Sequence, residues 1–89
     1  MREQSKTSPE MVLLKMQDDT GRLLKIPYTM RKKDVLGKLI RIHCNRMRQN
    51  PLHLRFLCND ITLDLNSTPE ELDLTNNDVI HVLPINIGA

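Results

Sequence analysis

The sequence predicts a single small α+β domain in which one long helix lies across a face of a mixed β-sheet. Near both ends of the chain, apolar residues alternate with polar ones or form short runs, which is typical of strands. Between these regions the apolar residues recur every three or four positions, which is typical of a helix. The chain has 89 residues, a length that allows one domain with a modest core.

The composition is that of an ordinary soluble domain, with 39% hydrophobic and 27% charged residues. The aromatic residues are Tyr28 and Phe56, so we expect an aliphatic core. No apolar run reaches membrane-spanning length and no signal-peptide pattern is present, so we expect a protein of the nucleus and cytoplasm. In those compartments Cys44 and Cys58 would be reduced thiols. A net charge of +2 gives no argument for nucleic acid as a partner.

The N-terminal part divides into a tail and a strand. Residues 1–10 are polar without an apolar period and are predicted to be a disordered tail. Residues 11–16 form an apolar run in which Val12, Leu14 and Met16 share one face of a strand.

The residues after this strand predict a hairpin. Residues 17–21 carry turn residues and end in Gly21, and residues 22–26 are a second strand. Pro27 lacks a backbone N–H, so we expect it to close this strand, with residues 28–33 as a basic loop.

A helix is predicted over residues 35–47, with Asp34 as its N-cap and Asn50-Pro51 beyond its end. Its apolar positions have helical spacing. They are Leu36, Leu39, Ile40, His43 or Cys44, and Met47.

The C-terminal part returns to strands. Residues 52–58 alternate, and residues 61–65 are a short strand or irregular segment. Residues 67–74 are predicted to form a short helical turn, with Ser67 or Thr68 as its cap.

The last strand is predicted over residues 79–85, where it is almost continuously apolar and therefore belongs in the sheet interior. The order β-β-α-β-β-(short helix)-β fits a β-grasp roll with the final strand in the middle of the sheet.

Several strings resemble the SUMO branch of the ubiquitin-like proteins. "LGKL" with "HCNR" resembles the SUMO helix, "LRFL" resembles its third strand, and "STPEELDLTNNDVIHV" resembles the segment that leads into its final strand. The resemblance covers residues 11–89 and implies a ubiquitin-like domain over residues 11–84, followed by a flexible tail over 85–89. The sequence departs from the SUMO pattern in three places. The loop before the helix is about four residues longer, the Gly after the third strand is missing, and the acidic cluster is reduced to "TNND".

This resemblance implies a protein modifier that is conjugated through its C-terminal tail to target lysines. Gly88 and Ala89 stand where SUMO proteins carry the Gly-Gly pair, and a tail that threads a narrow channel favours glycine. Ala89 either reduces conjugation, was introduced to resist cleavage, or marks a SUMO-like domain that is never conjugated. A frayed end without a role is the remaining alternative. The non-conjugated alternative would recruit the sumoylation machinery in genome maintenance.

The resemblance also implies a groove for SUMO-interacting motifs, which are apolar peptide strands with acidic flanks that add to a sheet edge. If this cluster is not such a groove, its apolar members are core and its cations are a solvated face. The implied groove residues are Leu23, Leu24, Lys25, Ile26, Lys38, Leu39, Ile42, His43 and Arg46.

The implied partners are the SUMO activating and conjugating enzymes, the SUMO proteases and proteins with SUMO-interacting motifs, bound by a monomer. We expect no cofactor and no enzyme activity, because no catalytic set or phosphate-binding loop stands out. The three histidines and two cysteines lack the close pairing of a zinc site. A basic nucleic-acid-binding module is the third class considered, and it would show steep salt dependence.

Overall fold

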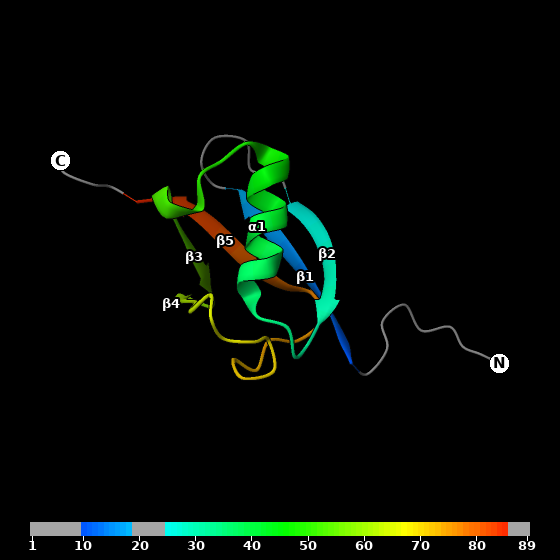
Figure 1. The fold of residues 1–89 in the computed structure, drawn as a ribbon. Coiled ribbons are helices and arrows are strands. Elements are labelled where there is room, and N and C mark those ends of the chain that lie inside the picture. The colour runs from blue at the N-terminus through cyan, green and yellow to red at the C-terminus, as the bar shows by residue number, and fades with distance from the viewer. Residues whose placement is uncertain (1–9, 19–24, 86–89) are drawn as a thin grey trace.

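The computed structural model describes residues 10–18 and 25–85. Its strands and helices are β1 (Met11–Asp18), β2 (Lys25–Arg31), α1 (Leu36–Met47), the 3-10 helix η1 (Pro51–His53), β3 (Leu54–Cys58), β4 (Ile61–Thr62) and β5 (Asp78–Pro84). The strands form one sheet in the order β2-β1-β5-β3-β4, and α1 crosses one face of it (Figure 1). β5 pairs in parallel with β1 and antiparallel with β3, so the last strand lies in the middle of the sheet, as predicted.

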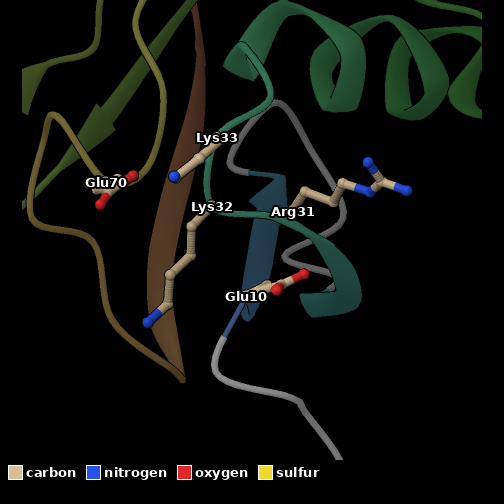
Figure 2. A pocket seen from close by; sticks show the side chains of 5 residues that line it. All are labelled: Glu10, Arg31, Lys32, Lys33 and Glu70. Atoms are coloured by element: carbon tan, nitrogen blue, oxygen red, sulfur yellow. The ribbon is translucent and has the colours of Figure 1, made fainter.

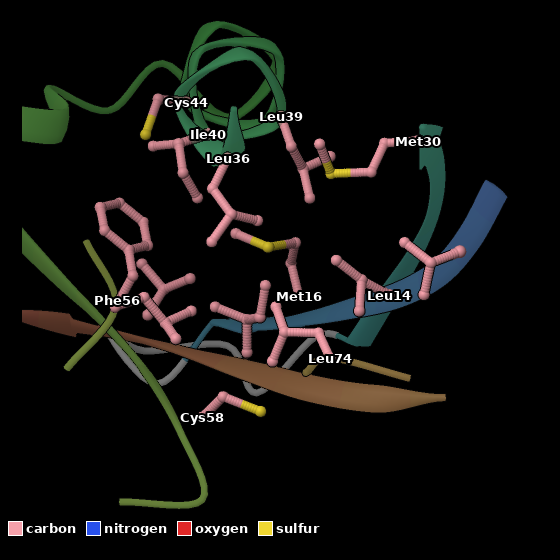
Figure 3. Packing of buried hydrophobic residues seen from close by; sticks show 14 residues of the cluster. Leu14, Met16, Met30, Leu36, Leu39, Ile40, Cys44, Phe56, Cys58 and Leu74 are labelled. Atoms are coloured by element: carbon pink, nitrogen blue, oxygen red, sulfur yellow. The ribbon is translucent and has the colours of Figure 1, made fainter. Parts of the chain in front are cut away.

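The core lies between α1 and the sheet face that it covers (Figure 3). Val12, Leu14 and Met16 of β1 are fully buried, which confirms the predicted apolar face of the first strand. The predicted helix face is also buried, including both His43 and Cys44, except that Met47 at its end is half-buried. β5 alternates in burial, because only one sheet face is covered by the helix.

The second strand corrects the sequence prediction. β2 continues through Pro27 to Arg31, so residues 28–31 are strand rather than basic loop. The Lys32 N–H donates to the Glu10 carbonyl, so these two residues form a hydrogen-bonded pair just beyond the β1–β2 ladder. Hydrogen-bonded and non-hydrogen-bonded pairs alternate along an antiparallel ladder, which makes Lys15 and Pro27 a non-hydrogen-bonded pair. The missing N–H of Pro27 therefore faces the open edge, where it costs no ladder bond.

The start of α1 also differs from the prediction. The N-cap residue is Val35, which makes no side-chain capping bond, and Asp34 instead pairs with Lys38 at 3.6 Å. The amide groups of Leu36 and Gly37 donate to the carbonyls of Ser67 and Leu65, each at 2.9 Å. Two carbonyls of a loop distant in the sequence therefore accept the hydrogen bonds of the first helix amides, in place of a capping side chain. A Cβ on Gly37 would lie 3.3 Å from the Leu65 oxygen, so this close approach favours glycine.

The region after α1 is shorter in strand than predicted. The first residues of the predicted strand 52–58 are η1, and Leu52 is 79% exposed rather than on the apolar side. β4 contains two residues of the predicted 61–65 segment. Asn59 and Asp60 both have positive φ, 54° and 66°, so two residues that tolerate the left-handed region form the turn in which SUMO carries glycine.

The predicted helical turn at residues 67–74 is a hydrogen-bonded turn with a reciprocal cap. The Thr68 hydroxyl accepts from the Glu71 N–H at 3.1 Å, and the Glu71 carboxylate accepts from the Thr68 N–H at 2.9 Å. Thr68, and not Ser67, is therefore the cap. The tails predicted at residues 1–10 and 85–89 lie mostly outside the described residues. At their inner ends, the Glu10 carbonyl accepts from the Lys32 N–H, and the Ile85 N–H donates to the His53 carbonyl.

Candidate functional site

The candidate site is the side of the domain where the edge strand β2 lies beside α1. Tyr28 of β2 and His43 of α1 meet there, with the Tyr28 hydroxyl 2.9 Å from Nδ1 of His43 and the rings in an edge-to-face contact at 5.6 Å. The guanidinium of Arg46 lies over the Tyr28 ring, 5.8 Å from its centroid. These three side chains connect the strand to the helix.

His43 is fully buried, and its Nε2 has no hydrogen-bond partner among the described residues. Burial lowers the pKa of His43 below 6.5; the Asp18 carboxylate opposes this shift and the Arg46 guanidinium adds to it. The imidazole is therefore neutral at pH 7 and is part of the wall of the site rather than a charged contact.

The structure brings five of the predicted groove residues to the accessible part of this side. Lys25, Lys38 and Arg46 are exposed, Ile42 is 58% exposed, and Ile26 is half-buried. Leu39 and His43 are buried at 3% and 0% exposure, so they support the site from below. Leu23, Leu24 and the tail residues Gly88 and Ala89 lie outside the described residues, so the groove itself stays a prediction.

Sequence reasoning missed the members of the site that lie beyond Pro27. Tyr28 contacts His43, and Thr29 and Arg31 lie further along the same edge strand. The missed signal was the alternation of Ile26, Tyr28 and Met30, which continues through the proline. Residues 32–35 separate β2 from α1, so part of the segment that was predicted as a loop before the helix is strand.

The outer edge of β2 offers backbone groups for hydrogen bonding. The ladder register directs the backbone groups of Lys25, Pro27, Thr29 and Arg31 away from β1. Within the described residues β2 pairs only with β1, so three N–H groups and four carbonyls face away from β1. The Arg31 carbonyl accepts from the Asp34 N–H at 3.2 Å, which leaves the carbonyls of Lys25, Pro27 and Thr29 for an added strand. This is the backbone pattern that an added strand requires.

Cations surround this edge. Lys25 and Arg31 are exposed at the two ends of β2, and Lys38 and Arg46 are exposed on the adjacent part of α1. Asp34 is the one carboxylate between residues 22 and 55, and it pairs with Lys38. The site therefore presents a positive rim around a partly aliphatic surface.

The described residues provide neither a reactive cysteine nor a metal-binding cluster. Cys44 and Cys58 are buried, and burial raises the pKa of both thiols, with Asp78 adding to the effect at Cys58. Thiols in this environment are poor nucleophiles. Among residues 10–18 and 25–85, no group of three or more His, Cys, Asp or Glu residues is placed to hold a metal ion. None of the helices described is long and apolar enough to cross a membrane.

Comparisons with known structures define the class of protein. A protein designed on the basis of ubiquitin superposes with a TM-score of 0.76 at 18% identity, covering 91% of this chain and 96% of that one. The ubiquitin of Caldiarchaeum subterraneum gives 0.76 at 15% identity, covering 89% and 99%. A chain from the pParkin-pUb-UbcH7 complex gives 0.73 at 14% identity, covering 86% of this chain and 24% of that one. The fold is therefore the ubiquitin-like β-grasp.

The family is narrower than this fold. Residues 12–83 match the family described as "Ubiquitin-2 like Rad60 SUMO-like", and the chain belongs to that family. This confirms the resemblance to SUMO seen in the sequence. The comparison with curated proteins returned no match.

Proposed function

We propose that this chain is a SUMO-like interaction domain that binds an extended apolar peptide with acidic flanks at the outer edge of β2. The observation that carries the proposal is the outward-facing backbone of Lys25, Pro27, Thr29 and Arg31 on a strand paired only on its inner side within the described residues. A peptide strand gains affinity from such main-chain bonds, whereas its side chains provide specificity.

The rim around this edge supports acidic flanks. Arg31 lies at one end of β2, and Lys38 is exposed on the neighbouring helix. Opposite charges across an interface fix the register of a bound peptide and accelerate its association. Ile42, which is 58% exposed on α1, supplies apolar surface next to these cations.

In this function the domain recruits proteins of the SUMO pathway without being conjugated itself. Membership of the Rad60 SUMO-like family supports a role in that pathway. The proposal places the domain in the nucleus and cytoplasm as a monomer. The partners are conjugating enzymes and proteins that carry SUMO-interacting motifs, in the setting of genome maintenance.

The test is the affinity of a fluorescent peptide with a branched aliphatic centre and Asp/Glu flanks, measured by polarisation. Arg31→Glu should weaken binding about tenfold, because it places a like charge beside the acidic flank. Arg55→Glu is the matched control, since Arg55 is exposed on β3, far along the sheet order from β2. Equal losses in both variants, or equal binding of a peptide with Lys flanks, would contradict the proposal.

Conjugation through the tail is the second candidate function. It is favoured by Gly88 and Ala89, which stand at the positions of the SUMO Gly-Gly pair a few residues after the central strand. The chain would be incubated with SUMO activating and conjugating enzymes and ATP, as given and as Ala89→Gly, and a thioester lost on reduction would be measured. Charging of the glycine form alone means that the alanine blocks a modifier, and charging of neither form eliminates this candidate.

A further inference from the structure

Positive and negative residues are concentrated in different segments of this chain, although its net charge is small. Residues 22–55 contain ten of the thirteen lysines and arginines and one of the eleven acidic residues. Residues 56–89 contain six acidic residues and no lysine or arginine. The first segment includes β2 and α1 and the second includes β4 and β5 (Figure 1). The two segments meet at one pocket, where Glu70 lies beside Arg31, Lys32 and Lys33.

The solvent-facing surface of α1 carries part of this positive charge. Its exposed positions are Lys38, Arg41, Ile42, Asn45 and Arg46, followed by the exposed Arg48 at the C-cap, and none of them is acidic. The helix contains 12 residues and is therefore about 18 Å long. Along B-DNA this length corresponds to about five phosphates of one strand.

Three further cations lie in the segment just before the start of α1. Arg31, Lys32 and Lys33 line a pocket of about 400 Å³ together with Glu10 and Glu70 (Figure 2). The Lys32 N–H donates to the Glu10 carbonyl at 2.8 Å, and the Lys32 carbonyl accepts from the Glu70 N–H at 3.1 Å. Backbone bonds on both sides therefore fix the segment that carries these cations.

Carboxylates offset this surface only in part, because Glu10 and Glu70 share the pocket with Arg31, Lys32 and Lys33 without forming an ion pair with them. In the part of the chain that the structure describes, Lys38 is the one cation with a carboxylate oxygen within 4 Å, and its partner is Asp34. We name the "α1 cationic band" the surface formed by these side chains. Its members are Arg31, Lys32, Lys33, Lys38, Arg41, Arg46 and Arg48.

We propose that the α1 cationic band is a second binding surface, which shares Arg31, Lys38 and Arg46 with the rim of the β2 edge and extends beyond it, and that it binds the phosphate backbone of double-stranded nucleic acid. A regular array of phosphates matches cations spread along a convex helix face, whereas an acidic peptide needs a groove or an open strand edge. Double strands fit better than single strands, because base stacking requires exposed aromatic rings. Tyr28, the only aromatic residue near the band, is half-buried beneath Arg46.

The surface contacts phosphates and no base edges, so binding depends strongly on salt and weakly on sequence. Contacts to about four phosphates give a slope near −3.6 for log K against log salt. Affinity then falls on the order of 100-fold between about 50 and about 200 mM salt.

The test is fluorescence anisotropy of the whole chain with a labelled duplex of mixed sequence over this salt range. The variant Arg41→Gln with Arg48→Gln removes two band cations and leaves Arg31, Lys38 and Arg46 beside the β2 edge intact. It should reduce the slope by about 2 and leave peptide binding unchanged. The matched control is Lys15→Gln with Arg55→Gln, which removes the same charge from β1 and β3 and should leave the slope within about 0.5 of the unmodified chain.

Glu70→Gln tests the pocket at the base of the band. It removes a negative charge beside Arg31, Lys32 and Lys33 and keeps the backbone N–H that bonds Lys32, so duplex binding should tighten a few-fold. Three outcomes overturn the proposal: a slope shallower than about −1, equal losses in the band and control variants, or tighter binding to vesicles of anionic lipid than to the duplex at the same salt.

Discussion

The hydroxyl of Tyr28 lies 2.9 Å from Nδ1 of His43 and joins the edge strand β2 to the helix α1. This contact occurs where the second strand was expected to have ended, one residue after Pro27. Because the other ring nitrogen of His43 is buried without a partner among the described residues, the tyrosine hydroxyl is the polar contact that the structure shows for this imidazole.

Tyr28→Phe should lower the free energy of unfolding by about 1–2 kcal/mol. The change keeps the ring and removes the hydroxyl, so it leaves the buried Nδ1 of His43 without its partner. Urea denaturation measures the effect. Thr29→Val is the control, since it removes an exposed hydroxyl from the same strand and should change stability by less than about 0.5 kcal/mol. Equal effects would show that the Tyr28–His43 bond does not connect strand and helix energetically.

His43 should make stability fall in mild acid. Its pKa is lowered in the fold by burial, whereas in the unfolded chain it titrates near 6.5. As the pH falls through 6.5, the unfolded state binds a proton that the folded state does not, so stability present above this pH is lost below it.

Denaturation curves at about pH 7.5 and about pH 5.5 measure this loss. His43→Gln should flatten the dependence, and His53→Gln, at the exposed last residue of η1, should preserve it. A His43→Gln chain that loses as much stability in acid as the unmodified protein would exclude His43 as the cause.

Arg48→Gly should stabilise the domain by about 1 kcal/mol. Arg48 is the C-cap of α1 with φ 57° and ψ 47°, a left-handed conformation that glycine adopts without cost. Arg41→Gly is the contrasting control, because a glycine inside the same helix should cost about 1 kcal/mol. Thermal and urea unfolding distinguish the two signs, and destabilisation by both variants would contradict the assignment of Arg48 as a strained cap.

Thr68→Ala should cost about 1 kcal/mol. It removes the hydroxyl that accepts the Glu71 N–H and leaves half of the reciprocal cap. Ser67→Ala is the matched control, since the contact that Ser67 makes with α1 uses its backbone carbonyl. Urea midpoints of the two variants should therefore differ clearly, and coincident midpoints would mean that the cap does not hold this turn.

Periodicity predicted the parts of the fold that depend on one buried face. Val12, Leu14 and Met16 alternate and are all fully buried, and the three-to-four spacing of α1 identified its core side. These patterns are local, so they can be read from the sequence. The central position of β5 was also predictable, because a nearly continuous apolar strand is typical of a sheet interior.

The errors arose where the deciding contact is distant in the sequence. Pro27 continues a strand because its nitrogen faces the open edge, and this depends on the pairing with β1. Asp34 is not the N-cap, because the carbonyls of Leu65 and Ser67 accept the first helix amides. The groove implied by the SUMO resemblance did not include Tyr28, Thr29 or Arg31, which lie on the same strand, and the groove stays a prediction.

Amide hydrogen exchange along β2 tests the central claim most directly, that this edge accepts a peptide strand. In the free protein the amides of Tyr28 and Met30, which face β1, should be protected, whereas those of Thr29 and Arg31 should exchange quickly. Saturation with the acidic-flanked peptide should slow exchange at Thr29 and Arg31. Binding that leaves these two amides as fast as before, while protecting residues elsewhere, would contradict the account.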